Sequence, residues 1–306
     1  MFFIKNRSPL AALAAFAALA ACLPGTPAGG GNRASGSGGD PDGQNTAVMV
    51  PDPADRLIEP REPGSPQPFR DQLERTLEAA EFPGELSRRI RDAALEGPSF
   101  ILDLLTALEG DPFLRLLVDK AHPLPDGYEP GDLTELAGGS YTVSREGLML
   151  RRSAADALEA MAAAARSGGI TLTASSAYRS CDYQAEVYAR NVRELGREAA
   201  DRESARPGYS QHQLGLVVDF GSITNDFAET RAGRWMEANA GRFGWSLSFP
   251  RGFEALTGYR WESWHYRYVG PELAAFIDTY FGGIQQYALR FLYEWERQTG
   301  EASRHS

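Results

Sequence analysis

The segment 210–219 reads SQHQLGLVVD, and its apolar run ends on a carboxylate, Asp219. A carboxylate is expensive to bury in apolar surroundings without a partner, and a bound cation is one such partner. His212 stands earlier in the same segment. A second segment, 261–266, reads WESWHY and sets Glu262 and His265 three positions apart among aromatic residues. Together the two segments predict a metal site, and the rest of the domain is interpreted around them.

Two imidazoles and one carboxylate are the usual protein ligands of catalytic zinc, which keeps its fourth position open for water. His212, Asp219 and His265 are therefore candidate ligands for one zinc ion, and Glu262 is the candidate base. Spacing alone leaves open that each histidine is an ordinary buried residue. Residues three apart on a regular strand point to opposite faces. Glu262 and His265 can therefore reach one site only if the backbone bends between them.

The surrounding sequence predicts an α+β domain with helices around a small sheet. Alternating or continuous apolar residues indicate strands, and apolar residues at helical spacing indicate helices. We expect strands at 170–175, 214–220, 245–249 and 259–268. We expect helices at 151–166, at 182–197 with Asp182 as the cap, at 226–244, and from Pro271 onward with a break at Gly282-Gly283.

The N-terminus predicts a secretory signal over residues 1–21, with Lys5 and Arg7 before an apolar run. That run is shorter than the roughly 20 apolar residues that an ordinary membrane-spanning helix needs. The residues LAAC at 19–22 resemble a bacterial lipobox, in which the cysteine, here Cys22, is acylated. A plain signal peptide is the alternative. The other cysteine is Cys181, so a lipidated Cys22 excludes an internal disulfide.

Composition divides the remaining chain. Residues 22–68 are rich in Gly, Pro and Ser and predict a flexible tether. Residues 69–115 predict a helical extension, 116–281 a mixed α and β domain that contains both chemical segments, and 282–306 a C-terminal helix and tail. The net charge of −10 argues against a nucleic-acid partner, which favours a basic surface.

The two chemical segments resemble the signature of the VanY-type D-alanyl-D-alanine carboxypeptidases, zinc peptidases related to the D-Ala-D-Ala dipeptidases. The family pattern is Ser-x-His-x-x-Gly-x-Ala-x-Asp, followed later by Glu-x-Trp-His. Two further stretches match in family order: SAYRS at 176–180, with Gln184 behind it, and HPLP at 122–125. Val217 replaces the usual Ala and Ser263 the frequent Pro, and both lie between site residues.

The resemblance implies a zinc-dependent D,D-carboxypeptidase that removes the C-terminal D-alanine from peptidoglycan stem peptides. It implies a small, mostly antiparallel sheet flanked by helices, with the zinc site on the sheet and an N-terminal helical extension. It further implies that Arg179 stabilises the oxyanion, while Ser210 and Gln184 are candidate substrate binders. With Cys22 as anchor, we expect an extracytoplasmic protein held on a bacterial membrane, on its periplasmic or cell-surface side.

Other functions are compatible with the same residues. The same site also fits an L,D-carboxypeptidase acting on tetrapeptide stems, or a D,D-dipeptidase. Two further hypotheses are not enzymes: a catalytically inactive wall-binding lipoprotein, and a zinc scavenger. The intact Glu262 argues against an inactive protein, because an inactive relative has no need of the base.

Overall fold

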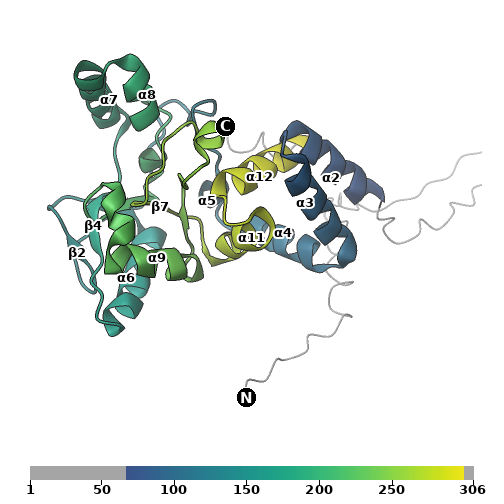
Figure 1. Ribbon diagram of the computed structural model, residues 1–306, viewed down its shortest axis with the longest axis horizontal. Coiled ribbons are helices and arrows are strands. Elements are labelled where there is room, and N and C mark those ends of the chain that lie inside the picture. Colours follow the sequence, from purple (N-terminus) through teal and green to yellow (C-terminus); the bar gives the residue numbers. More distant parts are fainter. Residues whose placement is uncertain (1–66, 300–306) are drawn as a thin grey trace, which may run out of the picture. The chain divides into compact units, whose positions relative to one another are not determined.

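The computed structural model describes residues 67–299 and contains a five-stranded sheet with helices beside it (Figure 1). Its strands run in the order β2 (Thr142–Val143), β4 (Thr173–Ser176), β5 (Val217–Phe220), β7 (His265–Tyr268) and β6 (Trp245–Leu247). Only β2 and β4 pair in parallel, and the other neighbours are antiparallel. The expected small, mostly antiparallel sheet is therefore confirmed.

The two faces of the central strands have different environments, because successive side chains of a strand point to opposite sides. Val218, Phe220 and Tyr266 join the larger hydrophobic core, which also contains the apolar face of helix α6 (Arg152–Ser167). Asp219 and His265 alternate with these residues and point away from that core. One face of the sheet therefore packs in the hydrophobic core, and the other face carries polar side chains.

A second core contains helices from both ends of the described chain. It contains α2 (Gln67–Ala79), α3 (Gly84–Glu96), α4 (Ser99–Glu109), α11 (Pro271–Phe281) and α12 (Gln285–Thr299). Phe100 of α4 is completely buried, and its ring centre lies 4.8 Å from that of Tyr280 and 6.1 Å from that of Phe291. The helical extension is therefore packed with the C-terminal helices.

Arg267 of β7 connects the sheet to this helical part. Its guanidinium is fully buried, and one nitrogen donates to the carbonyl oxygens of Phe113, Leu114 and Leu116 at 3.3, 3.1 and 2.8 Å. These carbonyls lie in and just after the short helix α5 (Pro112–Arg115). Burial lowers the pKa of Arg267 to about 9. A buried polar group needs such partners, so Arg267 fixes the chain that leaves the helices against the sheet.

Several expected elements are shorter than the sequence suggests. The strand expected at 214–220 begins only at Val217, because Gly215 adopts a left-handed φ of 69° and ends the 3-10 turn η2 (Gln211–Leu214). A Cβ at Gly215 would lie 3.0 Å from side-chain atoms of Arg151 and Leu133. The strand expected at 259–268 begins only at His265. Turn geometry therefore overrides the apolar and aromatic pattern at both places.

The helices show similar differences. The helix expected at 226–244 divides into η3 (Asn225–Glu229), α9 (Arg231–Asn239) and η4 (Ala240–Phe243). Helix α7 (Cys181–Leu195) is capped by Ser180, whose hydroxyl accepts from the Tyr183 amide at 3.1 Å, and not by Asp182. The break at Gly282-Gly283 is present, with both glycines at positive φ.

The remaining elements are the strand pair β1 (Leu133–Glu135) and β3 (Met149–Arg151), and the short helices α8 (Arg197–Glu203) and α10 (Glu254–Thr257). Cys22, the predicted signal and most of the predicted tether lie outside the described residues. Within residues 67–299, no helix has the length and apolar character needed to cross a membrane.

Replacing Phe100 by alanine should lower the free energy of unfolding by about 3–5 kcal/mol, because it leaves a cavity between α4 and the C-terminal helices. Urea unfolding followed by circular dichroism measures this loss. Leu102→Ala is the matched control on the same helix, since Leu102 is 44% exposed, and should cost less than about 1 kcal/mol. Equal losses in the two variants would contradict the packing described.

Candidate active site

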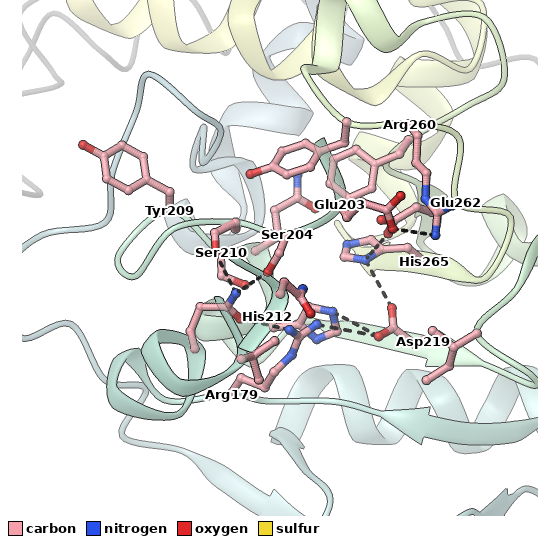
Figure 2. Close-up of a pocket in the computed structure, with 18 of the residues that line it drawn as sticks. Arg179, Glu203, Ser204, Tyr209, Ser210, His212, Asp219, Arg260, Glu262 and His265 are labelled. Atoms are coloured by element: carbon pink, nitrogen blue, oxygen red, sulfur yellow. Dashed lines mark hydrogen bonds and ion pairs between the residues drawn. The ribbon is translucent and has the colours of Figure 1, made fainter. Parts of the chain in front are cut away.

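Three buried side chains from separate parts of the chain meet on the polar face of the sheet (Figure 2). They are His212 from the turn η2, Asp219 from β5 and His265 from β7. One nitrogen or oxygen atom of each lies within 4.8 Å of the others, and all three residues are at most 4% exposed. The structure thus brings together three candidate ligands, although His265 follows the other two by more than forty positions in the sequence.

Local structure explains why they meet. Asp219 and His265 are directly opposite each other in the antiparallel register of β5 and β7. Opposed residues of such a pair hold their side chains close on the same face. Gly215 reverses the chain after η2, which returns His212 to the end of β5 where Asp219 lies. The His212 carbonyl also accepts from the Arg179 amide at 3.3 Å, which holds the turn against the segment after β4.

Among the residues that the structure describes, only one of the two ring nitrogens of His212 has a hydrogen-bond partner. Its Nδ1 donates to the carbonyl oxygen of Ala177 at 2.7 Å, since a carbonyl can only accept. Burial lowers the pKa of His212 to about 4, so the ring is neutral near pH 7 and Nε2 carries a lone pair. That lone pair faces the Asp219 carboxylate at 3.3 Å. Two acceptors directed at each other in a buried site repel, and a cation between them would remove that repulsion.

Unsatisfied atoms in the cluster lead to the same conclusion. His212 Nε2 and Asp219 Oδ1 are both buried without a hydrogen-bond partner among the described residues. His265 Nδ1 lies 3.2 Å from the same Asp219 oxygen. Buried polar atoms in proteins are nearly always paired, so an unpaired set of this kind needs an explanation. Two imidazoles and a carboxylate form a donor set that fits a zinc ion with one open position.

Glu262 reaches the same site because the chain turns just before β7. The amide of His265 donates to the carbonyl of Glu262 at 3.3 Å, and Glu262 precedes the strand. This is the bend that two residues three apart need in order to share a site. The carboxylate lies 3.4 Å from His265 Nδ1 and is mostly buried, next to the three-residue cluster.

Asn225, which the sequence analysis missed, holds this turn. Its side-chain nitrogen donates to the carbonyl of Trp261 at 3.1 Å, and its side-chain oxygen accepts from the amide of Ser263 at 3.1 Å. Both partners are the immediate neighbours of Glu262. An asparagine before an expected helix carries no signal of this task, because its partners lie far ahead in the chain.

Arg179 lies beside the cluster, where its Nη2 is 3.7 Å from Asp219 Oδ2. Its Nη1 donates to the amide oxygen of Gln184 at 2.9 Å, while Nε is buried without a hydrogen bond. The Gln184 amide nitrogen donates to Ser204 Oγ and to the Ala205 carbonyl, at 3.2 and 2.7 Å. Gln184 is fully buried and both of its donors are used. In this structure Gln184 holds Arg179, and its contact with a substrate stays a prediction.

These residues line a cleft of about 240 Å³. Ser210 lies in its wall, with little exposed surface (Figure 2). The Phe249 ring packs at a tilt against the His265 ring, with ring centres 4.6 Å apart, and against the Tyr259 ring, with ring centres 4.7 Å apart. Further lining residues that the sequence did not single out are Glu203, Ser204, Tyr209, Ile223, Tyr259 and Arg260. Glu203 is the last residue of α8, and the other five lie outside regular helices and strands, where no periodic pattern indicates which way a side chain points.

A polar network supports the cluster from behind. Gln211, next to His212, accepts a hydrogen bond from Ser248 at 2.8 Å. Gln285 at the start of α12 lies 3.3 Å from the same hydroxyl and donates to the Ser246 carbonyl at 3.2 Å. All four residues are buried. The C-terminal helix thus helps to position the turn that carries His212.

Comparison with known proteins identifies this arrangement. The family model VanY, D-alanyl-D-alanine carboxypeptidase, matches residues 147–271, which contain the whole cluster, Glu262 and Arg179. The putative carboxypeptidase YodJ of Bacillus subtilis is 34% identical over 193 residues, covering 61% of this chain and 71% of its own. The D-alanyl-D-alanine carboxypeptidase of Enterococcus faecalis is 32% identical, covering 53% of this chain and 60% of its own.

A solved structure shares the fold. It is the vancomycin-resistance D,D-dipeptidase VanXYg in complex with a D-Ala-D-Ala phosphinate analogue, with a TM-score of 0.51 and 25% identity. The match covers 58% of this chain and 70% of that one. The family model and the sequence relatives agree, and the chain belongs to the VanY family of D-alanyl-D-alanine carboxypeptidases.

Proposed function

We propose that this enzyme is a zinc-dependent D,D-carboxypeptidase that removes the C-terminal D-alanine from peptidoglycan stem peptides. The observation that carries the proposal is the buried lone pair of His212 Nε2, directed at the Asp219 carboxylate with no hydrogen bond between them. Family membership supports a carboxypeptidase, and the donor set supports the metal.

In this proposal His212, Asp219 and His265 hold one zinc ion. The Ala177 carbonyl fixes the tautomer of His212, which is a common arrangement around metal-binding histidines. A zinc ion held by these residues would supply a Lewis acid for the scissile carbonyl and would lower the pKa of bound water from 15.7 to about 7. The register of β5 and β7 keeps two of the ligands in place before any metal arrives.

Glu262 is assigned the proton transfers. It lies beside the ligands and is not needed as one of them, so its carboxylate can accept a proton from the attacking water. The same group can then return the proton to the leaving amine of D-alanine. The turn held by Asn225 keeps the carboxylate on the site side of β7.

Arg179 is assigned the negative charge that develops on the carbonyl oxygen. A guanidinium remains charged and offers several donors in fixed directions, and pre-placed donors of this kind stabilise transition-state charge. Gln184 holds the Arg179 side chain, and the unpaired Nε shows that donor capacity remains. Ser210, in the wall of the cleft, is the proposed contact to the peptide end.

Metal analysis should find about one zinc per chain, and a chelator should abolish release of D-alanine from a synthetic pentapeptide stem. Added zinc should restore that release. Chromatography of the products separates the alternatives: a D,D-dipeptidase releases D-Ala-D-Ala, and an L,D-carboxypeptidase cleaves tetrapeptides in preference. A metal-free protein that releases D-alanine at the original rate would contradict the proposal.

Glu262→Gln should lower kcat by about 10²- to 10⁴-fold, since it removes the general base, while zinc content stays at the wild-type value. Steady-state kinetics and metal analysis on the same preparation measure both. Glu96→Gln is the matched control, because Glu96 is exposed on α3 in the helical part. Unchanged turnover in Glu262→Gln is the result that would remove Glu262 from the mechanism.

We further propose that the chain is anchored through lipid on Cys22 and works outside the cytoplasmic membrane, where its substrate lies. The support is the LAAC motif after a basic and apolar start. Acyl chains contribute about 0.8 kcal/mol per buried methylene, so two or more chains give firm attachment. Cys22→Ser should therefore move the protein from the membrane fraction to the soluble fraction on immunoblots. If wild type and variant fractionate identically, the anchor is elsewhere or absent.

A further inference from the structure

A smaller cavity opens beside the active-site cleft. Its volume is about 170 Å³. Three residues line both this cavity and the cleft, namely Ser204, Tyr209 and Tyr259. The residues that line only the smaller cavity are Lys120, Asp201 and Arg206. We call this cavity the basic alcove, and its walls are continuous with those of the reaction site.

Lys120 is unusual in this chain. Of the 31 basic residues, only Lys5 and Lys120 are lysines, so Lys120 is the one lysine in the described part. Its ammonium lies 4.3 Å from the centre of the Tyr259 ring and donates to the backbone carbonyl of Asp201. Within residues 67–299 no carboxylate oxygen lies within 4.0 Å of it. This cation therefore enters the alcove without an anionic partner.

The path of the Lys120 side chain is built into the fold. Its stem crosses Gly258, where a Cβ would lie 2.8 Å from Lys120 Cδ and 2.9 Å from Cε. Gly258 has a positive φ of 75° and closes the short helix α10. Burial of the stem lowers the pKa of Lys120. Lys120 is exposed, but its contacts with Gly258 and the Tyr259 ring direct the ammonium toward the alcove.

The one acidic group in the alcove is already used. Asp201 accepts from the Tyr188 hydroxyl at 2.6 Å and from two nitrogens of Arg206 at 3.1 and 2.9 Å. The hydrogen bond from Arg206, followed by that from Tyr188, lowers the pKa of Asp201 to about 2. Two cations and one carboxylate leave the alcove with a positive excess located on Lys120. Such a cavity favours a negatively charged group.

A row of rings relates the alcove to the reacting centre. The His265 ring contacts Phe249, Phe249 contacts Tyr259, and Tyr259 lies under the Lys120 ammonium, with separations of 4.6, 4.7 and 4.3 Å. An extended peptide covers about 3.3–3.6 Å per residue. A substrate with its scissile bond at the cluster therefore places a group from about two to four residues upstream near Lys120.

We propose that the basic alcove binds a free carboxylate of the substrate peptide, located upstream of the scissile bond, and that Lys120 is its main contact. The inference rests on the proposed carboxypeptidase function, since it assumes a peptide that passes from the cluster along the cleft. It makes Lys120 a specificity-determining residue and defines the preferred substrate as an acidic stem peptide.

The test uses two pentapeptides that differ in charge alone. One is L-Ala–γ-D-Glu–meso-diaminopimelate–D-Ala–D-Ala with both upstream carboxylates free, and the other carries both as amides. Wild type should show a KM about tenfold lower for the free peptide, because a hydrogen bond between charged groups is stronger than one to a neutral amide. Lys120→Met should raise KM about tenfold for the free peptide and less than about twofold for the amidated one.

Matched variants separate recognition from general effects. Arg88→Met removes the same charge from an exposed site on α3 and should leave the KM of both peptides unchanged. Lys120→Arg keeps the charge and should restore part of the preference. Binding of both peptides to Glu262→Gln, measured by calorimetry with and without Lys120→Met, gives the same comparison without turnover.

Each outcome decides one question. Equal KM for the two peptides in wild type, or an equal loss on both peptides in Lys120→Met, overturns the role of the alcove while leaving the carboxypeptidase intact. If wild type releases D-alanine from neither peptide, the proposed function itself fails. If Lys120→Met does not fold, two comparisons still decide the inference. They are the KM values of the two peptides on wild type and the affinities of the two peptides for Glu262→Gln.

Discussion

The arrangement of the active site depends on one buried contact, that between Asp219 and the neutral ring of His212. The Ala177 carbonyl takes the only proton of this imidazole, so the second nitrogen presents a lone pair to a carboxylate at 3.3 Å. Without a cation this contact is unfavourable, because both groups accept and neither donates. The fold tolerates it because two sheet strands and a glycine-ended turn hold the groups in place.

That tolerance requires a rigid surrounding structure. The sheet packs one face on α6, while helices from both ends of the described chain form a second core. Arg267 and the polar network of Gln211, Ser248 and Gln285 connect the two parts through buried hydrogen bonds. The helices before and after the domain thus support the site structurally, even though none of their residues belongs to the cluster.

In the proposed function, chemistry and specificity occupy different parts of the cleft. The cluster, Glu262 and Arg179 act at the scissile bond itself, so they do not distinguish one stem peptide from another. The loops that line the rest of the cleft are the proposed contacts to the substrate farther from that bond. Related enzymes with similar clusters can therefore differ in the bond they cut, and the differences are expected in these loops.

The sequence by itself determined the class of fold and the family, and it singled out the three clustered residues and Glu262, because these appear as short motifs or as local periodicity. It could not determine where β5 and β7 begin. Turns at Gly215 and before His265 shorten both strands, although the apolar and aromatic pattern starts earlier. Nor could it show that Gln184 holds Arg179, that Asn225 holds the turn of Glu262, or that Lys120 enters a cavity beside Tyr259. No motif or periodicity in the sequence indicates these contacts, because they form only when the folded chain packs the residues against one another.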